Sequence, residues 1–213
     1  MLTVKAFTFN PFYENSYILS DETGECVIID PGCHIPEEEQ ELVEYISENG
    51  LKPVKLLNTH CHVDHVFGNL FVSETWKLGL VMHKLDVPVL DSFAKVCQMY
   101  GFEGKPQPEP SQFIEEGEQI KFGNTILDIL FTPGHSPGSV CFYNKPEQLM
   151  ISGDVLFQNS IGRSDLPGGN LAVLESSIRN KLYTLPDAVK VFSGHGPSTI
   201  IGWEKQNNPF VRP

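Results

Sequence analysis

The segment that decides the fold is Thr59-His60-Cys61-His62-Val63-Asp64-His65. It follows a short, largely apolar stretch, residues 54–57, which has the length and composition of a buried strand. Two histidines two residues apart in an extended or turning segment can approach one metal ion. The aspartate and histidine just beyond, where the chain turns into a helix, can reach a second ion a few ångströms away. The spacing therefore predicts a metal centre with two neighbouring sites.

Three more residues of the metal-binding type occur in similar local settings. His135, Asp154 and His195 each follow an apolar segment and a turn marked by glycine. Strand ends that gather along one edge of a sheet bring such side chains around one point, and zinc favours imidazole nitrogen together with carboxylate oxygen. The ordinary interpretation is that these histidines cap helices and satisfy backbone groups. The repeated setting favours metal binding instead.

The pattern along the chain predicts mixed strands and helices, with a proline-rich surface loop over 104–112. We expect two sheets packed together and covered by helices, an α+β fold. Glycine and asparagine at 123–124 predict a hairpin. The expected strands are 4–9, 16–20, 26–29, 54–57, 119–122, 125–131, 139–143, 149–151 and 189–192. The expected helices are 36–49, 67–78, 84–100 with an interruption near Pro88, 170–182 and 199–206.

Composition restricts the classes of function. The 213 residues carry 15 basic and 27 acidic side chains, a net charge of −12, so nucleic acids and anionic membranes are not expected partners. No apolar run approaches the roughly 20 residues of a membrane helix, and residues 1–10 do not resemble a secretory signal. Five cysteines without a C-x-x-C spacing indicate a reducing, cytoplasmic location. We expect one domain, 1–213, of two related halves.

Four other residues near these motifs allow two interpretations each. Cys61 lies between two convergent histidines and is expected to point away from them as an apolar filler rather than a ligand. His83 and His34 are expected to be structural or ordinary loop residues, with His83 at the edge of the site as its alternative. Asp30 ends an apolar strand before Pro-Gly, and it either orients a ligating histidine or makes only a local turn bond.

Taken together, these motifs resemble the metallo-β-lactamase superfamily, and the resemblance extends over nearly the whole chain. It implies an αβ/βα four-layer sandwich with the metals at one edge of the two sheets. Residues 162–169 and 194–197 further resemble the short, single-domain, glyoxalase II-like (hydroxyacylglutathione hydrolase-like) branch. By that resemblance the first metal is held by His60, His62 and His135, the second by Asp64, His65 and His195, and Asp154 bridges the two.

The resemblance implies a metal-dependent hydrolase that cleaves a small-molecule thioester, similar to S-lactoylglutathione, through attack of a metal-bound hydroxide. The implied cofactors are two divalent ions, zinc in first place and iron or manganese as alternatives. Asp64 is the expected acceptor of the attacking water's proton. Arg163 is expected to bind a carboxylate of the thiol carrier through its planar fork, its alternative being a surface pair with Asp165. Since the chain ends at Pro213, no C-terminal glutathione-binding helical extension is expected.

Two other functions stay open at this point. The first is a persulfide dioxygenase of the same superfamily, which uses one non-haem iron held by two histidines and one aspartate. The second is a metal-binding or redox-partner module without catalysis. Antibiotic hydrolysis is not expected, because zinc β-lactamases are exported and many carry cysteine where this chain has His65. The sequence predicts no particular oligomeric state.

Overall fold

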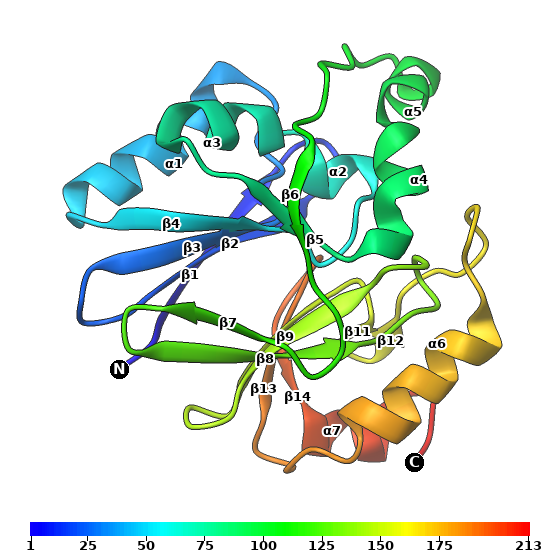
Figure 1. The fold of residues 1–213 in the computed structure, drawn as a ribbon. Coiled ribbons are helices and arrows are strands. Elements are labelled where there is room, and N and C mark those ends of the chain that lie inside the picture. The colour runs from blue at the N-terminus through cyan, green and yellow to red at the C-terminus, as the bar shows by residue number, and fades with distance from the viewer.

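The structure, a computed structural model, describes residues 1–213. Two six-stranded sheets lie face to face, and helices cover the outer face of each sheet. The layers therefore run helices, sheet, sheet, helices, as Figure 1 shows. The first sheet and its helices come from the first half of the chain, and the second sheet and its helices come from the second half. None of the helices has the length and apolar character needed to cross a membrane.

The first sheet has its strands in chain order and changes from antiparallel to parallel at β3. Its strands are β1 (Thr3–Phe9), β2 (Glu14–Ser20), β3 (Glu25–Ile29), β4 (Lys52–Leu57), β5 (Leu80–Met82) and β6 (Pro110–Phe113). The parallel connections contain helices, as such crossovers usually do. These elements are α1 (Pro36–Glu48), α2 (Val63–Val66), α3 (Asn69–Trp76), the short 3₁₀ turn η1 (Lys84–Asp86), α4 (Val87–Asp91) and α5 (Phe93–Tyr100).

The second sheet has the order β14-β13-β10-β9-β8-β7, with a parallel pair only between β10 and β13. Its strands are β7 (Gln119–Phe122), β8 (Thr125–Phe131), β9 (Val140–Asn144), β10 (Leu149–Gly153), β13 (Lys190–Ser193) and β14 (Thr199–Ile200). A small hairpin, β11 (Leu156–Phe157) with β12 (Ser160–Ile161), lies outside this sheet. The outer face is covered by α6 (Leu171–Ser177), the π-helical turn η2 (Ile178–Leu182) and α7 (Ile201–Asn207).

The sandwich forms because neighbouring residues of a strand point to opposite faces. Ile28 and Leu56 pack among the residues that face α1 to α5, whereas Ile29 and Leu57 pack against the second sheet. Both faces of β3 are buried from Cys26 to Ile29, which explains why this stretch is a continuous apolar run rather than an alternating one, whereas β4 is buried only at its end, Leu56 and Leu57. The register Ile29↔Leu57 ends β3 and β4 side by side, so the loops that follow both strands start from one edge of the sheet.

Most of the expected elements are present, with differences at their ends. The hairpin is confirmed, with β7 and β8 joined across residues 123–124. The helix expected over 67–78 is present as α3, and an unexpected short helix, α2, precedes it, because the chain already becomes helical at Val63, within the histidine motif. The loop expected over 104–112 ends in an edge strand, β6, which pairs with β5 on one side only. Proline has no backbone N–H to donate, and Pro110 is tolerated because an edge strand has one side without a partner strand.

Two elements of the second half also differ from expectation. The helix expected over 170–182 is α-helical only to Ser177 and continues as the π-helical turn η2. Asn170 caps it, with its side-chain oxygen accepting from Val173 N at 3.1 Å. The helix expected over 199–206 starts at Ile201, because Thr199 and Ile200 first pair with β13 as a short edge strand.

Candidate metal centre

The histidine motif lies where β4 ends and α2 begins. His60 is in the connecting turn and is only 2% exposed, and His62 is the extended residue immediately before the helix. Asp64 and His65 belong to the first turn of α2 itself. The change from extended to helical backbone at Val63 therefore separates the motif into two pairs, as the spacing predicts.

The other three residues come from the second sheet. His135 follows β8, Asp154 follows β10 and His195 follows β13. Close approach at this edge requires glycine at 194, because a Cβ there would collide with Asp154 Oδ1 and His65 Cε1. The strand ends of the two sheets thus converge, and all seven of the predicted metal-binding residues lie together.

His60, His62 and His135 form what we call the three-histidine cluster. Their ligand atoms lie within 4.8 Å of one another. The Nδ1 atom of His62 is 2.8 Å from Nε2 of His135, and that atom is 3.2 Å from Nε2 of His60. These three residues are the set that the resemblance assigns to the first metal.

Asp64, His65 and His195 form a second group, the mixed cluster, with ligand atoms within 4.8 Å of one another. Asp64 Oδ2 lies 3.1 Å from His195 Nε2 and 3.7 Å from His65 Nε2. Asp154 stands between the clusters. Its Oδ1 is 3.4 Å from His65 Nε2, and its Oδ2 is 3.5 Å from both His135 Nε2 and His195 Nε2. This is the position that a bridging carboxylate requires.

The donor atoms fit metal ions better than they fit one another. The ring nitrogens of the three-histidine cluster converge on one point, where a cation can receive their lone pairs. In the mixed cluster, His65 Nε2 and Asp154 Oδ1 are buried without a hydrogen-bond partner. Buried polar atoms are rarely left unpaired, so these two atoms indicate that a cation binds to both of them. Imidazoles with carboxylates form the donor set of zinc and of other first-row divalent metals.

Burial and charge set the protonation of these groups. Burial, with the neighbouring histidines, lowers the pKa of His60, and it lowers the pKa of His62 from 6.5 to about 3. Both rings are therefore neutral, the state in which a histidine can bind a metal. Burial also acts to lower the pKa of His65, but Asp64 and Asp154 outweigh it and raise that pKa above its ordinary value. The carboxylates of Asp64 and Asp154 therefore favour a positive charge at this site, and in the metal-free protein that charge is the proton on His65.

Asp30 supports the mixed cluster from behind. Its side chain is buried, and Oδ2 lies 3.1 Å from His65 Nδ1. The same carboxylate accepts hydrogen bonds from Thr59 N at 2.7 Å and from Thr59 Oγ1 at 2.5 Å. Asp30 adopts φ = 49°, a left-handed conformation that aspartate tolerates better than most residues. Of the two interpretations of Asp30, the structure favours the orientation of a ligating histidine.

Backbone carbonyls orient two further ligands. His135 Nδ1 lies 2.7 Å from the carbonyl oxygen of Arg163, and His195 Nδ1 lies 3.1 Å and 3.2 Å from those of Phe12 and Tyr13. Because a carbonyl only accepts, each Nδ1 carries the proton and each Nε2 keeps its lone pair for the cluster. The loops at 10–13 and 162–165 therefore belong to the rim of the centre.

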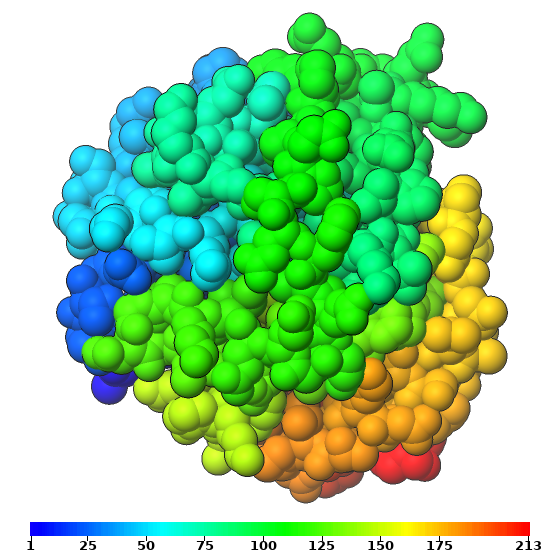
Figure 2. Space-filling model, in the orientation of Figure 1, coloured from blue at the N-terminus to red at the C-terminus, as the bar shows by residue number.

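The side chain of Arg163 contacts Asp165 rather than the centre. Its Nε and Nη2 atoms lie 2.7 Å and 2.9 Å from the two carboxylate oxygens, and both side chains are exposed. The structure thus shows the surface pair, and the binding of a substrate carboxylate by Arg163 stays a prediction. Figure 2 shows a notch in the molecular outline between the green segment around α5 and the yellow loop that contains Arg163.

The other cysteine and histidine candidates lie outside the two clusters. Cys61 is 2% exposed, and its Sγ lies 3.7 Å from Met82 Sδ, in the core between the sheet and helices. Burial raises the pKa of the Cys61 thiol, which keeps it protonated. His83 is stacked on Phe131, and His34 is bonded to a glutamate of α1. All five cysteines are free, and the cytoplasmic location stays a prediction.

Two buried carboxylates of the centre have no counterpart in the sequence-based predictions. Glu14 is fully buried, receives a hydrogen bond from Ser16 Oγ at 2.8 Å, and places Oε1 3.7 Å from His65 Nδ1. Asp86 accepts a hydrogen bond from Cys61 N at 2.7 Å. Glu14 begins a strand and Asp86 ends a 3₁₀ turn, positions where acidic residues are usually exposed. No spacing signal distinguishes them.

Comparison with known proteins identifies the family. Residues 9–195 match the sequence model of the Metallo-beta-lactamase superfamily. The chain belongs to the metallo-beta-lactamase superfamily. This confirms the predicted α+β sandwich and places the chain in a superfamily of metallo-hydrolases, whose fold binds metal ions.

Two relatives are similar in sequence to this chain over most of their length. A Bacillus subtilis protein named "Probable metallo-hydrolase YqgX" is 41% identical over 94% of this chain and 93% of its own. A Haemophilus influenzae protein named "Hydroxyacylglutathione hydrolase GloC" is 34% identical over 99% of this chain and 98% of its own.

Solved structures extend the comparison to metal content and to antibiotic hydrolases. TTHA1623, solved in a di-iron-bound form, is 37% identical with a TM-score of 0.88, covering 98% of this chain and 100% of that one. BLEG-1, described as a B3 metallo-beta-lactamase, is 34% identical with a TM-score of 0.85, covering 99% of this chain and 100% of that one. This chain is similar to both.

Proposed function

We propose that the protein is a metal-dependent thioester hydrolase with two divalent ions, zinc in first place. The observation that carries the proposal is the alignment with hydroxyacylglutathione hydrolase GloC along 99% of this chain. The seven gathered side chains support two ions rather than one, because each cluster offers three ligands and Asp154 lies between them. The persulfide dioxygenase would need only two of the histidines and one aspartate.

The clusters define which residues would hold the ions. His60, His62 and His135 would hold one ion, and Asp64, His65 and His195 the other. Ions bound there lower the pKa of a water molecule and polarise a carbonyl oxygen. The remaining work falls to the protein, which has to accept a proton and to orient a substrate.

Asp64 is the group proposed to accept the proton of the attacking water. Burial alone would raise its pKa, but the nearby His65 and His195 hold the pKa of Asp64 below its ordinary value. The carboxylate is therefore ionised near neutral pH, with Oδ2 directed at His195 Nε2. A thiolate is a good leaving group, so cleavage of a thioester requires no strong general acid.

Arg163 is the residue proposed to bind the thiol carrier. Its carbonyl oxygen is fixed against His135, so its side chain starts from the rim of the centre. A substrate carboxylate would replace Asp165 as the partner of the guanidinium fork, which makes two charge-assisted hydrogen bonds to either. This supplies local positive charge in a chain whose net charge is −12.

A substrate panel tests the proposal. The metal-loaded protein should hydrolyse S-lactoylglutathione and release free thiol, with little turnover of β-lactams, and the chelated protein is the matched control. Oxygen uptake with glutathione persulfide, without thioester turnover, would establish the dioxygenase instead. Faster turnover of a β-lactam than of any thioester would assign the chain to the activity named for BLEG-1. Metal analysis of protein purified without added metal accompanies the panel.

A further inference from the structure

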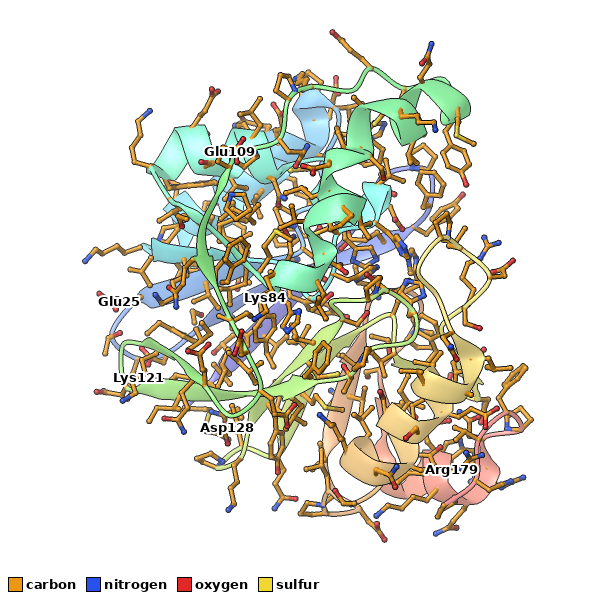
Figure 3. All side chains as sticks on the ribbon, turned by 45° about the vertical axis from the view of Figure 1, so that its right-hand side comes forward. Glu25, Lys84, Glu109, Lys121, Asp128 and Arg179 are labelled. Carbon is orange, nitrogen blue, oxygen red and sulfur yellow. The ribbon has the colours of Figure 1, made fainter.

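Asp86 is a buried carboxylate without a cationic partner. It ends η1, the turn that follows β5, and it is 1% exposed. Lys84, which starts the same turn, is labelled in Figure 3 where the two halves of the chain face each other, but it pairs with Glu115. Burial raises the pKa of Asp86, against the effect of its hydrogen bonds. Burying a carboxylate without a cationic partner costs free energy, so an interaction that compensates for this cost is expected.

The hydrogen bonds of Asp86 all come from the loops that carry the three-histidine cluster. Oδ2 accepts from Cys61 N at 2.7 Å, and Cys61 lies between His60 and His62. Oδ1 accepts from Ser136 Oγ, next to His135, and from Gly138 N at 2.5 Å. One carboxylate therefore connects the loop from the first sheet with the loop from the second.

The close fit around Asp86 shows that the connection is built into the chain. A Cβ at Gly138 would lie 2.7 Å from Asp86 N and 2.8 Å from its Oδ1, so only glycine allows this approach. Ser136 is fully buried, and its hydroxyl is directed at the carboxylate. The negative charge also faces the cluster: His135 acts to lower the pKa of Asp86, and positive charge at the cluster stabilises the carboxylate anion.

We propose that Asp86 is a positioning residue for metal binding, which fixes the two loops so that the three histidines converge before an ion arrives. Its loss should weaken binding at the three-histidine cluster and leave the mixed cluster nearly unaffected. The inference concerns metal binding and is independent of whether the substrate is a thioester. A residue with only a structural role would lower stability without discriminating between the clusters.

Glu204 provides a matched control. It too is a fully buried carboxylate, and it accepts hydrogen bonds from Asn159 N at 3.0 Å, Thr199 Oγ1 at 2.5 Å and Asn208 Nδ2 at 2.8 Å. None of these donors belongs to a loop that carries a metal ligand. Glu204→Gln should therefore reduce stability while zinc affinity at both clusters stays unchanged.

The experiment measures zinc affinity cluster by cluster. Asp86→Asn is made in two backgrounds, His65→Ala, which keeps the three-histidine cluster, and His60→Ala, which keeps the mixed cluster. Zinc is titrated into each metal-free protein against a chromophoric chelator, and urea unfolding of the same metal-free samples reports stability. In Asp86→Asn an amide NH₂ group replaces one of the two acceptor oxygens, so at least one of the hydrogen bonds to the carboxylate is lost and two donors face each other.

We expect zinc affinity to fall about tenfold or more at the three-histidine cluster, the usual effect of losing a group that orients ligands, and less than about twofold at the mixed cluster. Ser136→Ala, which removes one hydrogen bond and keeps the charge, should reduce affinity in the same direction by less, and it decides the matter if Asp86→Asn does not fold. Equal losses at both clusters, no loss at either, or the same selective loss in Glu204→Gln would overturn the proposal.

Discussion

Replacing Asp30 by asparagine changes one heavy atom next to the mixed cluster and should change which ring nitrogen of His65, a proposed metal ligand, carries the proton. Asp30 Oδ1 accepts from Thr59 N at 2.7 Å, so an asparagine would keep its oxygen there. Its amide nitrogen would then replace Oδ2, the atom 3.1 Å from His65 Nδ1. Two N–H groups cannot face each other, so a neutral His65 would have to carry its proton not on Nδ1 but on Nε2. That is the atom that faces Asp64 and Asp154, and with a proton on it the ring cannot bind a metal.

The expected losses of zinc affinity and of stability follow from the contacts that Asp30→Asn removes. Removing a group that orients a ligating histidine typically weakens metal binding by about 10- to 100-fold, which corresponds to about 1.4 to 2.8 kcal/mol. The metal-free protein also loses the two buried hydrogen bonds that Oδ2 accepts, from His65 Nδ1 and Thr59 Oγ1, and a hydrogen bond to a charged group is worth about 1.5–3 kcal/mol. Since the bond from Thr59 N is retained, we expect the stability loss of Asp30→Asn to lie at the lower end for two such bonds, about 3 kcal/mol.

Zinc titration against a chelator tests this in the His60→Ala background, where the mixed cluster is the one that remains. Asp21→Asn is the control, since Asp21 is also buried and accepts from Asn124 N at 2.7 Å and from Thr125 Oγ1 at 2.9 Å, in the β7–β8 hairpin. The control should be less stable than the parent and bind zinc normally. If Asp30→Asn also binds zinc normally, the tautomer of His65 does not depend on Asp30 and the reasoning is wrong.

Three other predictions concern metal, substrate and acid. Saturating zinc should give about two ions per chain, falling to one in His65→Ala, as measured by elemental analysis; one ion in active parent protein would contradict the binuclear centre. Arg163→Ala should raise KM for a charged thioester but not for an uncharged one, with metal content unchanged, whereas Asp165→Asn should not raise KM; equal effects on both substrates would show that Arg163 is structural. In metal-free protein, His62 has a pKa of about 3 instead of 6.5, so the folded state binds fewer protons than the unfolded state and acid reduces stability. Between about pH 8 and about pH 5, His62→Gln should lose ~2 kcal/mol less stability than the parent protein, as measured by urea unfolding. If the two proteins have the same pH profile, the pKa of His62 is not lowered in the folded state.

The sequence predicted the sheets well because their strands carry a local signal. A strand buried on both faces, such as β3, contains a continuous apolar run, and the hairpin at 123–124 has its own turn residues. The ends of helices were less predictable. The motif residue Val63 starts a helix that composition places several residues later, because tertiary contacts decide where a four-residue helix forms. Two strands of the first sheet, β5 and β6, were missed, and for β6 the reason is similar, since its pairing with β5 outweighs a proline-rich sequence.

The same distinction between local and distant signals explains which parts of the metal centre could be predicted. Each ligand has a local signature, a strand end followed by a turn, and strand ends meet at an edge whatever the details of packing. Asp30 shares that signature, so its two interpretations could at least be stated before the structure resolved them. Asp86 has none: its partners Cys61 and Ser136 lie 25 and 50 residues away along the chain, and only the packing of the two sheets brings them to one carboxylate. The residues proposed to bind the ions can therefore be recognised in the sequence, whereas the residues proposed to set the spacing between their loops require the fold.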